Sequence, residues 1–414
     1  MRKILASLDV GSSSLKLIVG EVLKNRLNVI TSVEVISRGI KNGYIVNLES
    51  ATEALKELFA KAEDILELPI KKVITTVPSY GAACFYTEGV TTITNADKII
   101  SNKDVTRAMQ ASVYNKVDDN QELISILPTG FVLNDVDKTA NPIGLKAEKL
   151  IIKAVAITIP KNNIEPVAKC LEAIGVEIID VVIGPLGDYY EFASNQTSND
   201  IGAIINIGRD KTEISIFNKG ILTATNTLDL GGSSIDSEIS FAYKINVKEA
   251  LYLKETLGVA HKNSADPEEY LSFDNKRGDL IRINQLDLSD IIYTRLVEML
   301  NLAKKQINTL TKRKISYIIV TGGLSELKDF NETIEEVFDN KAMIGEVFEM
   351  GIRHNKYSSS AGLIKYYNHR LNFRNIDFSI FNQEEEEELS GLHKKITFNE
   401  GSILGKLFGQ FFDS

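Results

Sequence analysis

Residues 8–15 (Leu-Asp-Val-Gly-Ser-Ser-Ser-Leu) place a carboxylate just before a glycine turn that joins two apolar segments. Glycine lets the backbone approach a bound group closely, and successive N–H groups with hydroxyls form a concavity for phosphate oxygens. Asp9 is suited to hold Mg²⁺ directly or through water, because Mg²⁺ takes a few carboxylates together with phosphates and waters. A plain β-hairpin with a polar turn is the alternative interpretation of this segment alone.

The same pattern recurs nearly half the chain later, at residues 205–212 (Ile-Asn-Ile-Gly-Arg-Asp-Lys-Thr). Two halves that open with the same hairpin predict duplicated lobes that face each other across a cleft. A third glycine turn, Thr321-Gly322-Gly323, follows another apolar strand. The three turns together favour nucleotide binding over plain hairpins, although the chain has no G-x-x-x-x-G-K-[ST] phosphate loop.

Short β-branched segments alternate with helical patterns over residues 1–370 and predict an α/β protein. Ser50 and Glu53 have capping-box spacing at the start of a helix expected to run to residue 66. Residues 80–160 are mostly strand-like with one helix and predict a small α+β insert. Residues 247–312 are predicted to be mostly helical, and the five glutamates at 384–388 indicate a solvated linker.

Composition excludes several classes of protein. With 47 basic and 56 acidic residues, the net charge of −9 argues against a nucleic-acid partner. Two cysteines and four widely separated histidines give neither a disulfide framework nor metal-ligand spacing. No apolar run reaches the roughly 18 residues of a membrane span, and Asp9 stands where a signal peptide needs its apolar core. We expect a cytosolic protein, or one that touches a membrane from the cytosolic side.

Residues 401–414 form an amphipathic pattern. At about 100° per residue, six apolar side chains fall on one half of a helical wheel. They are Ile403, Leu404, Leu407, Phe408, Phe411 and Phe412. Such a segment lies in a membrane interface, and a helix docked on the core or on a partner is the alternative. Because Lys406 is offset by Asp413, apolar burial must carry most of the affinity, which linked copies would strengthen.

The order of the three glycine turns resembles the actin/Hsp70/sugar-kinase superfamily. Finer matches resemble the bacterial cell-division FtsA family and cover about residues 1–370 together with the terminal segment. The matching stretches are residues 37–43 with 48–50, 141–145, 230–236, 295–300 and 357–363. The resemblance implies an actin-like two-lobed ATPase fold with an FtsA-type 1C subdomain and a C-terminal amphipathic helix. It also implies an ATP-binding polymer that holds the tubulin-like division protein FtsZ against the cytoplasmic face of the cell membrane, at the division site.

The resemblance also implies a division of the chain. Lobe 1 (1A) would comprise residues 1–78, 161–198 and 340–370, and the inserted 1C subdomain residues 79–160. In the second lobe, 2A would comprise residues 199–235 and 308–339, and 2B residues 236–307. An acidic linker at 371–400 and the membrane-targeting helix at 401–414 would complete the chain.

Carried over position by position, the resemblance implies a nucleotide site on the glycine turns and one lysine. Its residues are Asp9, Gly11, Ser12, Ser13, Lys16, Gly208, Thr212, Gly231, Gly232, Lys254, Gly322, Gly323 and Leu324. Asp9 would hold Mg²⁺. Arg295 and Glu298 form, by spacing alone, an i,i+3 pair on a solvated helix face, and the resemblance makes this the helix that receives the C-terminal peptide of FtsZ.

The second loop departs from the family pattern. Asn206 replaces an acid, Arg209, Asp210 and Lys211 replace glycines and threonine, and Leu251 replaces an acid near Lys254. One metal-directed charge is lost, although Lys211 could itself meet a phosphate. We therefore expect at most a weak ATPase that binds ATP and Mg²⁺, FtsZ, membrane lipid and its own copies. The alternatives are a small-molecule kinase of the same superfamily and a nucleotide-independent scaffold.

Overall fold

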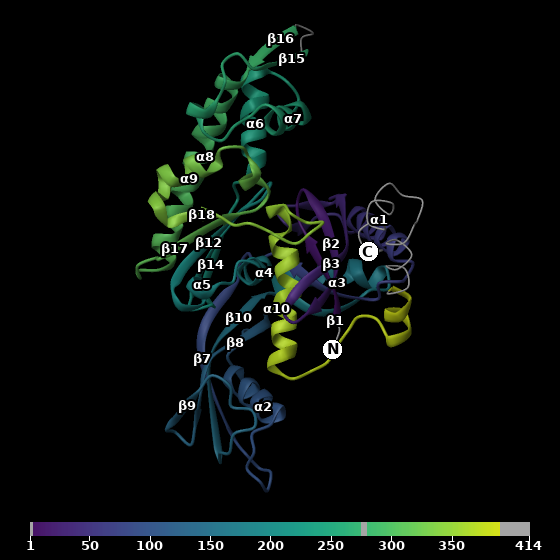
Figure 1. Cartoon of the computed structure of the whole chain (residues 1–414), viewed down its shortest axis with the longest axis vertical. Helices are drawn as coiled ribbons and strands as arrows, with labels where there is room; N and C mark the ends of the chain where they lie inside the picture. Colours follow the sequence, from purple (N-terminus) through teal and green to yellow (C-terminus); the bar gives the residue numbers. More distant parts are fainter. Residues whose placement is uncertain (1–2, 275–279, 390–414) are drawn as a thin grey trace, which may run out of the picture.

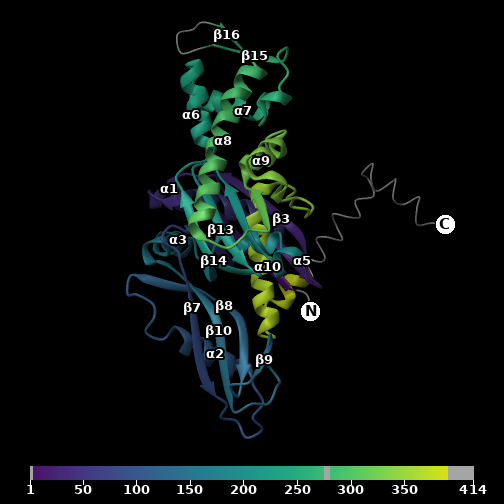
Figure 2. The ribbon, with the colours of Figure 1, turned by 90° about the vertical axis from the view of Figure 1, so that its left-hand side faces the viewer.

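The computed structural model describes residues 3–274 and 280–389 of the 414-residue chain. Two five-stranded sheets form its centre, the insert extends from one end of the long axis, and helices with a small hairpin extend from the other (Figures 1 and 2). Within the described residues, no helix combines the length and the apolar character that crossing a membrane requires.

The sheet of lobe 1 has the strand order β11-β6-β1-β2-β3. Its strands are β1 (Lys3–Val10), β2 (Ser14–Leu23), β3 (Arg26–Ile36), β6 (Lys72–Val77) and β11 (Glu177–Ile183). The helices of this lobe are α1 (Leu48–Leu66), α3 (Lys161–Ala173) and α10 (Ser358–Phe373), and a small hairpin is formed by β4 (Ile40–Lys41) and β5 (Tyr44–Ile45). β1 to β3 form an antiparallel meander, whereas β6 runs parallel to β1 and β11 parallel to β6.

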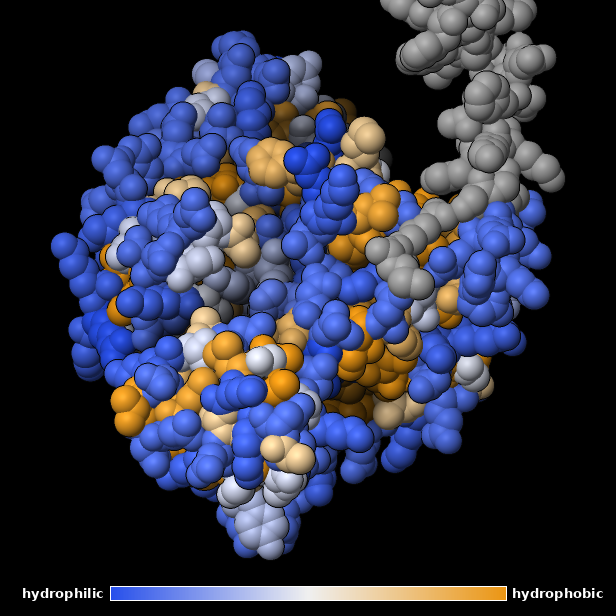
Figure 3. All heavy atoms as spheres, turned by 60° about the horizontal axis from the view of Figure 1, so that its bottom comes forward, coloured by the Kyte–Doolittle hydropathy of each residue, from blue (hydrophilic) through white to orange (hydrophobic). Residues whose placement is uncertain are grey.

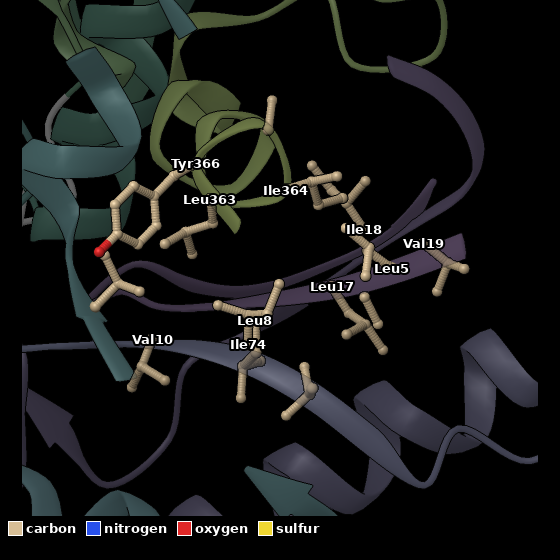
Figure 4. Close-up of a cluster of buried hydrophobic side chains, with 14 of the residues drawn as sticks. Leu5, Leu8, Val10, Leu17, Ile18, Val19, Ile74, Leu363, Ile364 and Tyr366 are labelled. Atoms are coloured by element: carbon tan, nitrogen blue, oxygen red, sulfur yellow. The ribbon is translucent and has the colours of Figure 1, made fainter. Parts of the chain in front are cut away.

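The central strands of lobe 1 are apolar on both faces because helices cover both sides of the sheet. Figure 4 shows Leu5 and Ile18 on the side of α10, and Leu8 and Leu17 on the opposite side. These side chains are fully buried. This two-sided burial fixes the hairpin that carries the first glycine turn.

The sheet of lobe 2 repeats the pattern with the order β14-β13-β12-β17-β18. Its strands are β12 (Ile201–Ile207), β13 (Thr212–Asn218), β14 (Ile221–Leu228), β17 (Tyr317–Thr321) and β18 (Ala342–Ile344). Again three strands form an antiparallel meander, and the other two run parallel to its first strand. The duplication predicted from the repeated turn is confirmed. β18 belongs to this sheet, so the lobe boundary predicted at residue 340 is too early.

The other elements of lobe 2 are mostly helical. They are α6 (Gly232–Tyr243), α7 (Val247–Thr256), α8 (Gln285–Leu310), α9 (Phe330–Phe338), β15 (Tyr270–Asp274) and β16 (Leu280–Asn284), with the 3-10 turns η1 (Lys262–Ser264), η2 (Gly323–Glu326) and η3 (Asp339–Lys341). The β15–β16 hairpin was not predicted. The chain passes from lobe 1 to lobe 2 through α4 (Gly184–Glu191) and α5 (Asn195–Asn199), and the turn η4 (Asn355–Tyr357) leads into α10.

The insert is a four-stranded antiparallel sheet with one helix. It comprises β7 (Ala83–Thr92), α2 (Asn102–Val113), β8 (Gln121–Leu133), β9 (Asp137–Thr139) and β10 (Lys149–Pro160). The strand order is β7-β10-β8-β9. Val105, Phe131, Leu150 and Ile152 belong to its own buried core. The insert is therefore packed as a unit, as the strand-rich pattern predicted.

The capping box predicted at Ser50 and Glu53 is wrong. α1 begins at Leu48, and the backbone N–H of Ser50 donates to the side chain of Asn47 at 2.9 Å. Asn47 satisfies a free N–H of the first turn three residues earlier than predicted, because asparagine is as good an N-cap as serine.

The linker predicted to begin at residue 371 is also wrong for residues 371–389. After α10 the chain returns to lobe 1, where Ile380, Phe381 and Leu389 are buried. The N–H of Ile380 donates to the carbonyl of Ile4 at 2.9 Å, and residues 383–389 are helical. We call residues 376–389 the C-terminal strap. The glutamates keep contact with water while the apolar side chains are buried in lobe 1. The run of glutamates therefore predicts a linker although the segment is anchored.

Candidate functional site

The site begins with the two glycine hairpins, which have matching registers. In lobe 1, Asp9 on β1 lies opposite Lys16 on β2. In lobe 2, Asn206 on β12 lies opposite Glu213 on β13. Because directly paired residues point to the same face of a sheet, each hairpin presents one pair of polar side chains at its turn.

The first glycine turn is held tightly. Lys16 Nζ lies 3.0 Å from Asp9 Oδ2, and Thr76 Oγ1, near the end of β6, donates to Asp9 Oδ1 at 3.1 Å. The Ser12 hydroxyl accepts the N–H of Gly43 at 2.8 Å. A Cβ at Gly11 would lie 2.8 Å from the carbonyl of Ser14, so the turn needs glycine.

The second glycine turn is tied to the start of α6. The N–H of Gly232 donates to the carbonyl of Gly208 at 3.0 Å, and the Thr212 hydroxyl donates to the carbonyl of Leu230 at 2.7 Å. A Cβ at Gly231 would lie 2.5 Å from the carbonyl of Arg209. The predicted residues of this loop therefore form one compact unit at a helix N-terminus, where anions are favoured.

Lys254 and the third glycine turn lie against the residues of the second loop. The Lys254 ammonium lies 2.6 Å from the carboxylate of Asp236 and donates to the carbonyl of Gly232 at 3.3 Å. A Cβ at Gly232 would touch both Lys254 and Leu324. Gly322, with φ of +94°, lies against Asn206 and Ile207. The structure thus brings the second-loop glycines, Lys254 and Leu324 together, and their binding of a nucleotide stays a prediction.

Asn206 has a defined partner, the buried Asp188 of α4. The Asn206 amide donates to Asp188 Oδ2 at 2.8 Å, and the hydroxyls of Ser358 and Ser359 donate to Oδ1 at 2.7 and 2.8 Å. Burial raises the pKa of Asp188 to about 6, and the hydrogen bond from Asn206 acts in the opposite direction. An amide fits at position 206 because its N–H group donates to the carboxylate of Asp188, which a second carboxylate would repel.

Replacing Asn206 by aspartate is expected to destabilise the protein by about 1–3 kcal/mol at pH 8, because two carboxylates would then meet without water. Burial raises the pKa of Asp188, so a proton stabilises the folded state, and this stabilisation is lost as pH rises through about 6. The loss should therefore be smaller at pH 5.5, when urea denaturation is compared at the two pH values. Asn226→Asp, on the exposed side of β14, is the control, and equal destabilisation at both pH values would argue against the contact.

Side chains that follow β6 bridge the two lobes. Ser79 donates to the carboxylate of Glu213 and shares a 3.1 Å hydrogen bond with Thr227, and Tyr80 donates to Asp229. Burial and the hydrogen bond to Asp229 raise the pKa of Tyr80. Sequence reasoning missed Asp188, Asp229 and Glu213. Only Glu213 carried a signal, because it lies seven residues after Asn206, as Lys16 does after Asp9.

Arg295 and Glu298 lie on α8 as an i,i+3 pair, with Arg295 Nη1 2.7 Å from Glu298 Oε2. Arg295 also pairs with Glu238 of α6 at 2.6 Å. All three side chains are partly exposed, so this is a solvated ionic cluster. The six apolar residues predicted to bind a membrane, Ile403, Leu404, Leu407, Phe408, Phe411 and Phe412, lie outside the described residues.

Solved structures share this architecture. The chain superposes on the PilM–PilN type IV pilus biogenesis complex with a TM-score of 0.60 and 14% identity, covering 87% of this chain and 97% of that one. It matches MreB5 of Spiroplasma citri bound to ADP with a TM-score of 0.55 and 12% identity, covering 90% and 99%. Two lobes of equal strand order, each with a glycine turn between its first two strands, define an actin-like ATPase fold.

Two family models identify the member of this class. The one described as "Cell division protein FtsA" matches residues 203–362, and the one described as "SHS2 domain inserted in FTSA" matches residues 82–158. The chain belongs to the FtsA family of cell-division proteins. It is 28% identical to cell division protein FtsA of Bacillus subtilis (90% of this chain, 86% of that protein) and 29% identical to that of Staphylococcus epidermidis strain RP62A (92% and 83%). The predicted fold class and family are thus confirmed.

Proposed function

We propose that this chain binds ATP–Mg²⁺ at the junction of its lobes, self-assembles, and tethers FtsZ filaments to the cytoplasmic face of the membrane at the division site. The observation that supports the proposal is the pair of matching glycine hairpins, the second of which packs against Lys254 and Leu324, within a member of the FtsA family. The MreB5 structures of the same fold are described as bound to ADP and to AMPPNP, which supports a nucleotide as the ligand here.

The donor set suits a metal that arrives with the nucleotide. Within the described residues, no cluster of three or more His, Cys, Asp or Glu side chains could hold a metal ion alone. Asp9 provides one carboxylate beside the first turn, and Mg²⁺ takes its other ligands from phosphates and water. Bound Mg²⁺ would neutralise phosphate charge there, while Lys16 and the turn N–H groups orient the phosphates. We expect hydrolysis to be weak, because position 206 holds an amide where the family pattern has an acid.

Self-assembly is supported by apolar side chains exposed at both ends of the long axis. Val136 in the insert is 75% exposed, and Phe241 on α6 is 81% exposed. Figure 3, viewed toward the insert end, shows hydrophobic residues gathered in patches among hydrophilic ones. Different apolar surfaces at the two ends favour head-to-tail contacts between copies. Such contacts build open filaments when they do not close into a ring.

Membrane attachment is proposed for residues 401–414. Leu389 of the strap packs into lobe 1, so the rest of the chain leaves from that lobe. Each apolar side chain buried in lipid contributes about 1.5–3 kcal/mol at most, and we expect one copy to attach reversibly because an interfacial helix does not span the bilayer. Copies linked in a filament attach far more strongly, because detaching one leaves it held by its neighbours.

FtsZ binding is proposed for the face of α8 around Arg295. An acidic peptide there would compete with Glu238 and Glu298 for the guanidinium. We therefore expect weak binding that falls as salt rises.

The test is co-sedimentation of FtsZ with phospholipid vesicles. FtsZ is expected to pellet only with the full-length chain, and more with ATP–Mg²⁺ than without. A version that ends at Glu400 should leave FtsZ in solution, with a loss of vesicle binding of at least about tenfold because the apolar face is gone. Arg295→Glu should still pellet but carry less FtsZ.

Two results would contradict the proposal. If the version ending at Glu400 pellets as well as the full chain, the tail is not the anchor. If neither version pellets with or without nucleotide, membrane tethering fails. Binding of the shortened version to FtsZ in free solution is the control that it remains folded.

A further inference from the structure

We propose that Glu213 supplies the second-loop carboxylate toward nucleotide-bound Mg²⁺, in the place that position 206 would otherwise fill. This inference rests on the nucleotide site proposed above. Glu213 is not among the nucleotide-site residues that the family resemblance implied. The proposal assigns the acid of the second hairpin to β13 and not to β12, the strand that carries Asn206.

The first step is the equivalence of the two hairpins. Asp9 and Lys16 pair across β1 and β2, and Asn206 and Glu213 pair across β12 and β13. The residues of each pair are seven positions apart and occupy the same places in their sheets. Cross-strand partners have Cβ atoms about 5 Å apart on one face, so an acid at 213 stands beside the place of an acid at 206.

The second step is that the side chain at position 206 is already held by Asp188 and Gly322. The Asn206 amide donates to Asp188, and its Oδ1 faces Gly322 so closely that a Cβ there would come within 2.5 Å. The side chain is therefore held on the α4 side of the junction. A carboxylate at 206 would face Asp188 instead of a metal, and the acidic function needs another position.

The third step is the environment of Glu213. The residue is only 8% exposed, and its Oε1 accepts the Ser79 hydroxyl and lies 3.1 Å from Lys211 Nζ. Within the described residues, no hydrogen bond to Oε2 is found, and this oxygen lies so close to Gly184 that a Cβ there would come within 3.3 Å of it. The charge of Glu213 is paired with Lys211 through Oε1, and Oε2 keeps its acceptor capacity for a further ligand.

The fourth step is the position of Glu213 relative to Asp9. Thr76 donates to Asp9 and Ser79 donates to Glu213, so one short segment at the end of β6 anchors both carboxylates. The anchors are three residues apart, which limits their Cα separation to about 10 Å. Mg²⁺ commonly uses one or two carboxylates together with phosphates and several waters. The two acids on opposite lobes therefore suit one hydrated metal.

Two lysines would change partners when the nucleotide binds, from the two acids to the phosphates. In the structure each acid is paired with a lysine of its own hairpin, Lys16 with Asp9 and Lys211 with Glu213. Lys211 Nζ also lies beside Gly43, whose N–H donates to Ser12 of the first turn. A metal–polyphosphate offers negative phosphates to the two lysines and a cation to the two acids, so every charge keeps a partner on binding.

The test measures ATP affinity by isothermal titration of the full chain, in EDTA and in Mg²⁺. For the unmodified chain, Mg²⁺ should strengthen ATP binding at least about tenfold, as expected for a charge-assisted contact. Glu213→Gln keeps an acceptor for Ser79 and removes only the charge. It should bind ATP in EDTA at least as well as the unmodified chain, while the strengthening by Mg²⁺ falls below about threefold.

Asp229→Asn is the matched control, because it removes the charge of another lobe 2 carboxylate that contacts lobe 1 through Tyr80. It should keep the full Mg²⁺ effect, and Glu213→Asp should restore part of it. If Glu213→Gln keeps the full effect, Glu213 only joins the lobes. If the unmodified chain binds ATP equally with and without Mg²⁺, the metal role fails while nucleotide binding stands. If it binds no ATP in either buffer, both proposals are overturned.

Discussion

Replacing Gly362 by alanine is expected to destabilise the protein by about 4 kcal/mol or more, because α10 and α4 cross with their backbones in contact. A Cβ at Gly362 would lie 1.7 Å from the carbonyl of Gly187. From the other side, a Cβ at Gly187 would lie 2.4 Å from the carbonyl of Ser359. The clashing atoms are backbone, so no rotamer change relieves them, and the helices must separate. Urea denaturation followed by circular dichroism measures the loss.

Gly130→Ala on β8 is the control for this prediction. No atom lies within 4 Å of a Cβ at Gly130, so its effect should stay below about 1 kcal/mol. A Gly362→Ala variant as stable as the control would show that the two helices do not pack at this distance. Separation of the helices should also disturb Asp188, because its serine partners lie on α10 one turn before Gly362.

The second large effect is expected for Lys365→Met. Lys365 Nζ lies 3.0 Å from Glu191 Oε2 and 2.5 Å from Glu349 Oε1, and the Glu191 side chain is 2% exposed. Removing the ammonium leaves the buried Glu191 and the partly buried Glu349 without their cation, which costs about 3–5 kcal/mol where both acids are ionised. Lys169→Met is the control, because the pair that Lys169 forms with Glu165 at 3.9 Å is exposed and contributes at most about 0.5 kcal/mol.

The Lys365 cluster also predicts a dependence on pH. Burial raises the pKa of Glu191 to about 8, whereas hydrogen bonds from Lys365 and Glu191 lower the pKa of Glu349. Glu191 therefore holds a proton in the folded state at neutral pH. Its contribution to stability is complete below pH 4.5 and is lost as pH rises through about 8. The Lys365→Met loss should be greater at pH 9 than at pH 6.5, and a loss that is constant over this range would contradict this assignment.

The sequence was enough to predict the two lobes, because the same turn recurs in both and a turn is encoded by adjacent residues. Adjacent residues also encode each glycine turn, and the structure places Gly232 of the second loop beside Lys254 and Leu324. It could not predict the role of Asp188, whose partners Ser358 and Ser359 lie some 170 positions away. For Glu213 the sequence holds only the seven-residue spacing from Asn206, and the register of the sheet sets the two residues opposite each other.

The errors had local causes. Five adjacent glutamates predict a linker at the strap, yet the two buried side chains of Ile380 and Phe381 suffice to dock the segment. The β15–β16 hairpin was missed because its surroundings are polar and irregular, and periodicity is weak in short, half-exposed strands. In each case tertiary contacts, and not local propensity, decided the structure.

The strap also determines where mechanical load would enter the molecule. β1 pairs with β6 only at Ser7 and Leu8, so the carbonyl of Ile4 has no partner on β6. The N–H of Ile380 in the strap donates to this carbonyl instead. Phe378, between Lys72 and Tyr367, adds a second hold on the same lobe. A pull on the chain beyond residue 389 is therefore taken up by one sheet. Tension from a lipid surface would load lobe 1 first and would reach lobe 2 through the contacts of Ser79 and Tyr80 with that lobe.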